Sequence, residues 1–302
     1  MAWKPFMTKP SRVLRFGAHT ALALLLIFCI FAAIGEPTQS EGRPHPITLA
    51  WGNDILAIHH SGIPGGKIDT WYLEAYCRAG STERKWEDSL ISHETDLLSI
   101  NEEKTVLKLR CTLSDGVTID HVIRAVPDGV TLDLVARNPG NTASLVHWAQ
   151  PCTRVGTFTG TGSSVTNDKY AYLKRSFIFQ NDDDEPDFMP TTSWAMEARY
   201  VPGQVWCPAD VPRTDVNPRP LNPKAPSLGL IGCLSGDEKW ILAMAWEPYQ
   251  ELFQGVIRCL HSDFRIGGLA PGEEKRIRGR FYLVPNDFPS LVARYKKEFP
   301  DR

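Results

Sequence analysis

The stretch Thr105–Arg137, TVLKLRCTLSDGVTIDHVIRAVPDGVTLDLVAR, decides the fold of this chain. It contains three runs in which apolar and polar residues alternate, and a period of two is typical of strands with one buried face. Asp115-Gly116 and Asp128-Gly129 separate the runs, and Asp-Gly pairs favour the tight turns of β-hairpins. The stretch therefore predicts a three-stranded antiparallel meander.

Runs of the same character lie on both sides of the meander. Ile47–Trp51 and Ile55–His59 flank Gly52-Asn53-Asp54, which predicts another hairpin. The other predicted strands are Trp71–Tyr76, Ser144–Ala149, Leu228–Leu234, Trp240–Trp246, Val256–His261 and Lys275–Val284.

One good helix is expected, Phe288–Phe299, near the end of the chain. Its apolar residues fall on one face, and Asn286 or Asp287 can cap its first turn. Together with the strands, this helix predicts an all-β fold, an antiparallel β-supersandwich with a C-terminal helix. A single domain at 46–302 is expected, since the sequence has no solenoid repeat and no domain linker.

Within this domain, residues 157–226 form a proline-rich excursion in which the strand periodicity fades. Seven prolines between Pro202 and Pro226 exclude central strands and long helices there. The segment also contains Trp194, Tyr200 and Trp206, so we expect an ordered excursion packed over one face of the sheet. Long ordered loops of this kind are usually functional.

The N-terminus has the features of an export signal. Four basic residues precede an apolar run from Ala21 to Ile34, and the first acidic residue is Glu36. Such a run is of signal-peptide length and short for a membrane span. We expect a signal peptide at 1–35, a tether at 36–45 and a periplasmic or extracellular protein. The alternative is an uncleaved N-terminal anchor, the only membrane association that the sequence suggests.

The net charge and the cysteine content restrict the classes of partner and cofactor that this chain is expected to bind. Removing four of the 33 basic residues with the signal leaves 29 against 35 acidic residues, a net charge of −6, without a basic run that would indicate nucleic acid. Six cysteines remain, and an even number in an exported chain fits either buried thiols or disulfides. Their pairing is left open. Because no CxxC is present, no metal site from neighbouring ligands and no cofactor are expected.

A second stretch, Ala245–Val284, AWEPYQELFQGVIRCLHSDFRIGGLAPGEEKRIRGRFYLV, predicts the floor and rim of a polar site. It combines titratable groups with aromatic rings, which suit ligands that have one apolar and one polar side. The residues in question are Trp246, Glu247, Tyr249, Glu251, His261, Asp263 and Arg265. The alternative for each ring is core packing, and for the His-Asp-Arg group a structural cluster.

Two motifs resemble the galactose mutarotase-like (aldose-1-epimerase) superfamily. The first is Thr131–Gln150, TLDLVARNPGNTASLVHWAQ, a strand ending in Asn, a turn, another strand and a His-bearing segment before Pro. The second is Leu269-Ala270-Pro271-Gly272-Glu273, which resembles the PGE entry to a late strand in that superfamily. The chain as a whole also resembles a family of exported bacterial proteins.

The resemblance implies a β-supersandwich that acts on a sugar through histidines, an aspartate and a late glutamate as base. His147 matches the first histidine, and the glutamate could be Glu247, Glu251 or Glu273. The chain departs from the family in one string: Asn-His-x-(Tyr/Phe)-Phe-Asn is replaced by His147-Trp148-Ala149-Gln150-Pro151.

The candidate residues therefore divide by role. Ring opening needs a base and an acid with pKa values near the working pH; the catalytic candidates are His147, Glu247, His261 and Asp263. The candidates for contacts with a sugar are Trp148, Arg265, Trp246, Tyr249 and Glu251, together with Asp215 and Arg219 from the proline-rich excursion.

The sequence leaves two main functions open. One is an exported carbohydrate-active protein, with epimerase-, lyase- or hydrolase-type acid-base chemistry on a sugar or sugar acid. The other is a β-sandwich without catalysis that binds a glycan or an envelope protein. A purely structural envelope protein is a third. Turnover, and its loss on changing a catalytic histidine, separates the first from the others.

Overall fold

The computed structural model describes residues 46–162, 171–191, 205–218, 220–255 and 258–300. Pro44–Arg302 form one compact unit. The predicted signal peptide and tether lie outside the described residues, and export stays a prediction. In the described ranges, no helix has both the length and the apolar character needed to cross a membrane.

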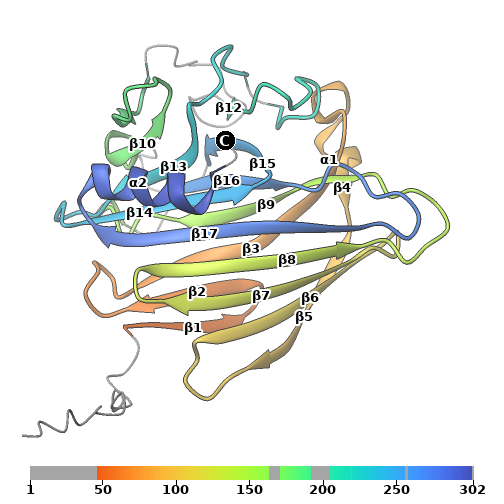
Figure 1. The fold of residues 1–302 in the computed structure, drawn as a ribbon, viewed down its shortest axis with the longest axis horizontal. Coiled ribbons are helices and arrows are strands. Elements are labelled where there is room, and N and C mark those ends of the chain that lie inside the picture. Colours follow the sequence, from red (N-terminus) through yellow and green to blue (C-terminus); the bar gives the residue numbers. More distant parts are fainter. Residues whose placement is uncertain (1–45, 163–170, 192–204, 219, 256–257, 301–302) are drawn as a thin grey trace, which may run out of the picture. The chain divides into compact units, whose positions relative to one another are not determined.

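Two antiparallel sheets make up the described fold (Figure 1). Sheet A has the order β1 (Ile47–Gly52), β2 (Ile55–His60), β3 (Lys67–Arg78), β9 (Val146–Arg154), β16 (Cys259–Arg265), β15 (Tyr249–Gln254) and β12 (Val205–Trp206), and β4 (Leu90–Ile91) pairs with β3. Sheet B has the order β11 (Asp187–Phe188), β10 (Ser176–Phe179), β13 (Leu228–Leu234), β14 (Trp240–Glu247), β17 (Glu274–Pro285), β8 (Gly129–Arg137), β7 (Thr118–Val126), β6 (Val106–Leu113) and β5 (His93–Ile100). The helices are α1 (Trp86–Ser89) and α2 (Phe288–Glu298), with 3₁₀ turns at Ser81–Glu83 and Leu173–Arg175.

The predicted all-β class is confirmed, and so are its most regular parts. β6, β7 and β8 form the meander, in continuous antiparallel register. β1 and β2 form the first hairpin, and Asn53 and Asp54 both have positive φ, which the tight turn requires. The prediction missed β5 and β15, and also the short strands β4, β10, β11 and β12.

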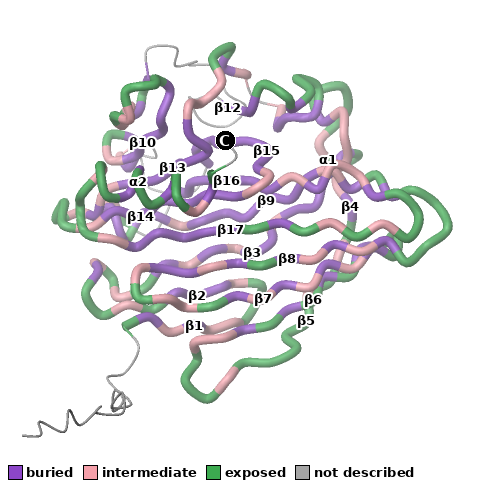
Figure 2. Tube along the Cα trace, in the orientation of Figure 1, coloured by how far each residue is buried: buried purple, intermediate pink, exposed green. Residues whose placement is uncertain are grey.

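The main core lies between the two sheets, and Figure 2 shows the buried inner strands. Inward residues such as Leu107 and Leu109 of β6 alternate with exposed ones, as the sequence predicted. Trp246 of β14 and Phe264 of β16 meet across the sheets with ring centroids 4.8 Å apart. The contact places the central strands of sheet A against those of sheet B.

The predicted C-terminal helix is also confirmed. Asp287 caps α2 by accepting a hydrogen bond from the backbone N–H of Ser290. Leu291, Val292 and Tyr295 pack on strands β10, β13, β14 and β17, so the helix covers the outer face of sheet B. This part of sheet B is therefore closed to a ligand by the helix.

One histidine sits in the core without the charge that it would carry in mildly acidic water. His121 of β7 is 1% exposed, and its ring nitrogens contact the hydroxyls of Tyr72 at 2.9 Å and Tyr76 at 3.4 Å. Burial lowers the pKa of His121 to about 3 from 6.5, against the opposing charge of Asp120. The folded protein therefore keeps this imidazole neutral in mildly acidic solution.

Acidification below pH 6.5 is expected to destabilise the protein through His121. Between pH 6.5 and about 3 the unfolded chain binds a proton here that the folded chain does not, so stability falls as the pH falls. The contribution approaches about 1.4 kcal/mol per pH unit. Urea unfolding of His121→Gln at pH 7 and pH 5 should show a smaller pH effect than the wild type. The exposed-histidine control His59→Gln should match the wild type, and an unchanged pH effect in His121→Gln would refute the assignment.

Candidate functional site

The outer face of sheet A carries a row of polar side chains. On β16, Leu260 and Phe264 point into the core, so Cys259, His261, Asp263 and Arg265 share the opposite face. β9 runs antiparallel beside it and pairs Trp148 with Arg265 and Arg154 with Cys259. The sequence thus lays out ionisable groups along two neighbouring central strands.

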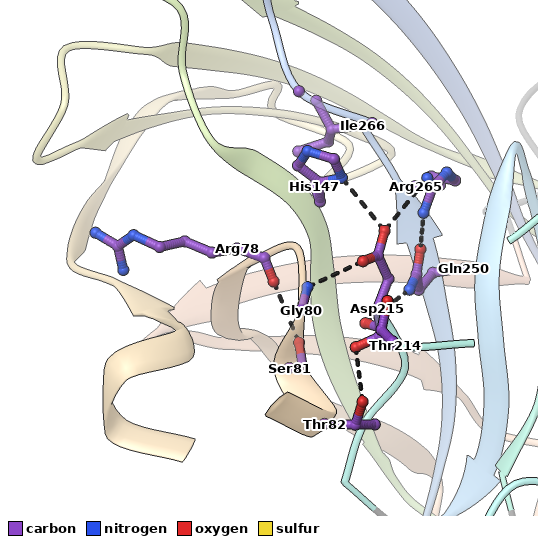
Figure 3. A network of polar contacts seen from close by, with 12 residues as sticks. Arg78, Gly80, Ser81, Thr82, His147, Thr214, Asp215, Gln250, Arg265 and Ile266 are labelled. Atoms are coloured by element: carbon purple, nitrogen blue, oxygen red, sulfur yellow. Dashed lines mark hydrogen bonds and ion pairs between the residues drawn. The ribbon is translucent and has the colours of Figure 1, made fainter. Parts of the chain in front are cut away.

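Asp215 organises one end of this row (Figure 3). Its Oδ2 lies 3.5 Å from His147 Nδ1 and 3.6 Å from Arg265 Nη2. Its Oδ1 accepts a hydrogen bond from the backbone N–H of Gly80 at 2.9 Å. Gln250 completes the group, since its Oε1 accepts from Arg265 Nη1 at 2.6 Å and its Nε2 donates to the Asp215 carbonyl at 3.2 Å. We call these four side chains, His147, Asp215, Gln250 and Arg265, the Asp215 site.

The loop after β12 delivers Asp215 to the sheet. Val205, Cys207, Val211 and Val216 form a small apolar cluster with Phe253 of β15, which fixes the loop over the outer face. The backbone N–H of Asn217 donates to Glu251 Oε2 at 2.8 Å. In Figure 3 Thr214 also reaches Thr82 near the 3₁₀ turn at Ser81. Apolar packing and polar contacts together hold this part of the proline-rich excursion in place.

Accessibility and charge distinguish the members of the Asp215 site. The side chains of His147 and Arg265 are 23% and 19% exposed, whereas that of Asp215 is 7% exposed. Burial lowers the pKa of His147, the Asp215 carboxylate opposes this shift, and the Arg265 and Lys275 charges add to it. His147 is therefore neutral at pH 7 and can accept a proton.

His261 belongs to a second group on the same face, farther along β16. Its Nδ1 lies 3.6 Å from Asp263, and its Nε2 lies 3.5 Å from Cys259 Sγ and 4.0 Å from a Glu74 oxygen. The imidazole stacks on Phe253 at 4.3 Å with a 7° angle between the planes. Burial alone would lower the pKa of His261, but its contacts with Cys259 and Asp263 outweigh it and raise the pKa to about 10.

A pocket of about 250 Å³ lies beyond this second group. Lys67, Asp69, Arg154 and Arg258 line it, together with Gly65, Gly156 and Thr157. Arg154 is the strand partner of Cys259, so the pocket borders the His261 group. Three cationic side chains and one carboxylate favour an anionic ligand there.

The structure brings together only some of the residues that the sequence selected. His147, Asp215 and Arg265 meet at the Asp215 site. His261, Asp263 and Glu251 lie on the same face, and all three are buried. Trp148 is fully buried beside Trp86, with ring centroids 6.2 Å apart. These residues therefore fall into one partly exposed group and one buried group.

The other selected residues lie elsewhere. Glu247 ends β14 in sheet B, where Arg278 of β17 pairs with it. Trp246 and Tyr249 are core residues, which is not the position of rings that stack on a ligand. The stretch from Ala245 is thus no continuous floor, because its first strand belongs to sheet B and its next two to sheet A. Arg219 lies outside the described residues.

Sequence reasoning missed Glu74 and the cationic pocket, and it placed Gln250 in the polar stretch without assigning it a role. Glu74 was inside a predicted strand, but β3 shifts register between Trp71 and Ala75, so alternation could not assign its face. Gln250 lies at a similar shift on β15. The pocket joins residues from β3, β9 and three loops, and proximity of this kind has no local sequence pattern.

Comparisons with known proteins give limited similarity. No family model and no curated protein matches the chain. Among solved structures, an Escherichia coli K12 protein proposed to be an aldose 1-epimerase is 13% identical, with a TM-score of 0.42 and coverage of 79% of this chain and 99% of that one. A galactose mutarotase-like protein from Lactobacillus casei ATCC 334 is 7% identical, with a TM-score of 0.42 and coverage of 79% and 100%. The Slr1438 protein of Synechocystis sp. PCC 6803 is 10% identical, with a TM-score of 0.43 and coverage of 78% and 91%.

Two of these proteins carry the name of the superfamily that the sequence resembles. Their identities and TM-scores are too low to support an argument about activity or ligand. The function of this chain therefore has to be argued from its own side chains.

Proposed function

We propose that this chain is an exported carbohydrate-active protein that binds a sugar acid at the Asp215 site. One observation carries the proposal: His147 and Arg265 share a single Asp215 oxygen, and both remain partly exposed. A base and a cation held side by side suit a ligand that offers a proton next to a carboxylate.

Each member of the site has a role in this proposal. Arg265 pairs with the carboxylate of the ligand and withdraws charge from it, which makes the proton on the adjacent carbon more acidic. Neutral His147 accepts that proton. Asp215 orients the imidazole through Nδ1 and stabilises it once it is protonated. Epimerisation and elimination both begin with this step. Hydrolysis would need a carboxylate pair, and Glu251 and Asp263 are fully buried.

The Arg265→Gln variant is expected to bind D-galacturonate about 10–100-fold more weakly than the wild type, since a hydrogen-bonded charge pair is lost. Isothermal titration calorimetry with D-galacturonate and with neutral D-galactose measures the effect. Binding of galactose should change little. The control Arg124→Gln removes an exposed arginine that pairs with Asp133 in sheet B and should bind as the wild type does.

Two results would count against the proposal. One is a wild type that binds neither sugar. The other is an equal loss of galacturonate and galactose affinity in Arg265→Gln, which would indicate a structural role for the guanidinium.

The cationic pocket favours a second candidate, binding of an anionic glycan without turnover. The pocket has a volume of about 250 Å³ and is lined by three cationic side chains. Its lining residues include no histidine that could act as a base. Under this alternative, Arg154→Gln weakens galacturonate binding and Arg265→Gln leaves it unchanged, the reverse of the result expected for the Asp215 site.

A further inference from the structure

We propose that Cys152, Cys259 and His261 bind a zinc ion on the outer face of sheet A, with Glu74 as the fourth ligand. The two Sγ atoms and a ring nitrogen of His261 lie within 4.8 Å of one another, and all three residues are buried. Thiolate sulfur and imidazole nitrogen are ligands that zinc prefers. The proposal is independent of the sugar-acid function.

The strand pairing supplies this geometry. β9 and β16 are antiparallel, and the pairing of Leu260 with Thr153 sets His261 opposite Cys152, with Cys259 two residues away on the same face. Cys259 Sγ is 3.5 Å from His261 Nε2. At bond lengths of about 2.3 Å to sulfur and 2.0–2.1 Å to nitrogen, tetrahedral zinc ligands lie about 3.5 Å apart. The pair therefore needs little movement to bind an ion.

The surroundings of His261 fit a metal ligand. Its Nε2 faces Cys259 and Glu74, and its Nδ1 faces the Asp263 carboxylate at 3.6 Å. Histidines that bind metals commonly present one nitrogen to the ion and the other to a carboxylate, which fixes the ring. The stacked Phe253 ring restricts the imidazole further.

Glu74 and Gly255 complete the site. A Glu74 oxygen lies 4.0 Å from His261 Nε2, within reach of a fourth position. A Cβ at Gly255 would come 2.2 Å from Cys259 Sγ and 2.9 Å from His261 Nε2, so glycine leaves room beside both ligands.

No local sequence pattern indicates this site, because its ligands come from three strands that are distant in the chain. The absence of a CxxC argued only against ligands from one local segment. None of the six cysteines among the described residues forms a disulfide. A disulfide between Cys152 and Cys259 is the competing state of the same two thiols in an oxidising compartment.

The full-length protein, purified without chelator, is expected to contain about one zinc per chain by inductively coupled plasma mass spectrometry. Replacement of zinc by Co²⁺ should give thiolate-to-cobalt charge-transfer absorption and the intense visible bands of tetrahedral cobalt. Zinc uptake by the apoprotein should release protons, because both thiols must ionise and the His261 imidazole must be neutral to bind the ion.

Variants separate this site from adventitious binding. Cys259→Ser should lose the bound zinc and the charge-transfer band, whereas the control Cys233→Ser, a buried cysteine of sheet B, should keep both. Glu74→Gln should keep the thiolate band but change the visible bands and bind Co²⁺ more weakly. If Cys259→Ser does not fold, the proposal is tested by comparing the Co²⁺ spectra of the wild type and Glu74→Gln, which should share the thiolate band and differ in the visible bands.

Three results would overturn the proposal. The first is a wild type without zinc and without cobalt absorption. The second is a Cys152–Cys259 disulfide in a non-reducing peptide map of the isolated protein. The third is a cobalt spectrum that survives unchanged in Cys259→Ser.

Discussion

Replacing Trp246 with alanine is expected to lower the free energy of unfolding by about 3–5 kcal/mol. The ring is 1% exposed and meets Phe264 at 4.8 Å between the sheets. A Cβ on Gly279 would come 2.3 Å from this ring, so the neighbouring strand is shaped around the indole. Alanine would leave a cavity that these neighbours cannot close without moving two strands.

Urea denaturation followed by circular dichroism measures this loss. The control is Trp51→Ala, because Trp51 is only partly buried at the margin of the same core and should lose less stability. If Trp246→Ala kept nearly full stability but lost sugar binding, the ring would be a ligand contact as the sequence suggested, and its assignment to the core would be wrong.

The His147→Gln variant is expected to lower turnover of a sugar acid by about 10²–10⁴-fold, the usual contribution of a general base. Proton NMR of short oligogalacturonides can follow the change, because it detects epimerised and unsaturated products in one spectrum. Since burial lowers the pKa of His147, the acid limb of the wild-type rate profile should lie below pH 6.5. Galacturonate affinity should fall much less than turnover.

His59→Gln is the matched control, since His59 is an exposed histidine of the same sheet. It should retain full turnover and the same pH profile. If the wild type binds uronates but converts none of them, the protein is a binding protein and not an enzyme for these ligands. Unchanged turnover in His147→Gln would instead show that another residue is the general base.

The fold could be predicted from the sequence because strands and turns are indicated by residues that are close together in the chain. Alternation in β6, β7 and β8 and the turns at Asp115 and Asp128 depend on neighbouring residues, and the structure follows them closely. β15 was missed because Tyr249–Gln254 is buried at every position, so no polar-apolar alternation marks it. Both faces of β15 are buried because the loop after β12 covers this part of sheet A. Such burial depends on tertiary packing and cannot be read from the residues of the strand itself.

The site could be predicted only in part. His147, Asp215 and Arg265 were selected for their chemistry, but sequence spacing gives no reason why positions so far apart should meet. Glu247 and Glu251 are four residues apart and looked equivalent, yet the chain passes from sheet B to sheet A between them. Resemblance alone could not choose between these glutamates, because the choice depends on where the chain changes sheets.

The strand order of sheet A also governs when the site can form. Its centre joins β3, β9 and β16, which extend from Lys67 to Arg265, and such long-range pairing slows folding. No segment that ends before Arg265 contains the complete Asp215 site. A nascent chain that ends before Arg265 therefore lacks part of the Asp215 site, and this site arises late, with the closing of the central strands.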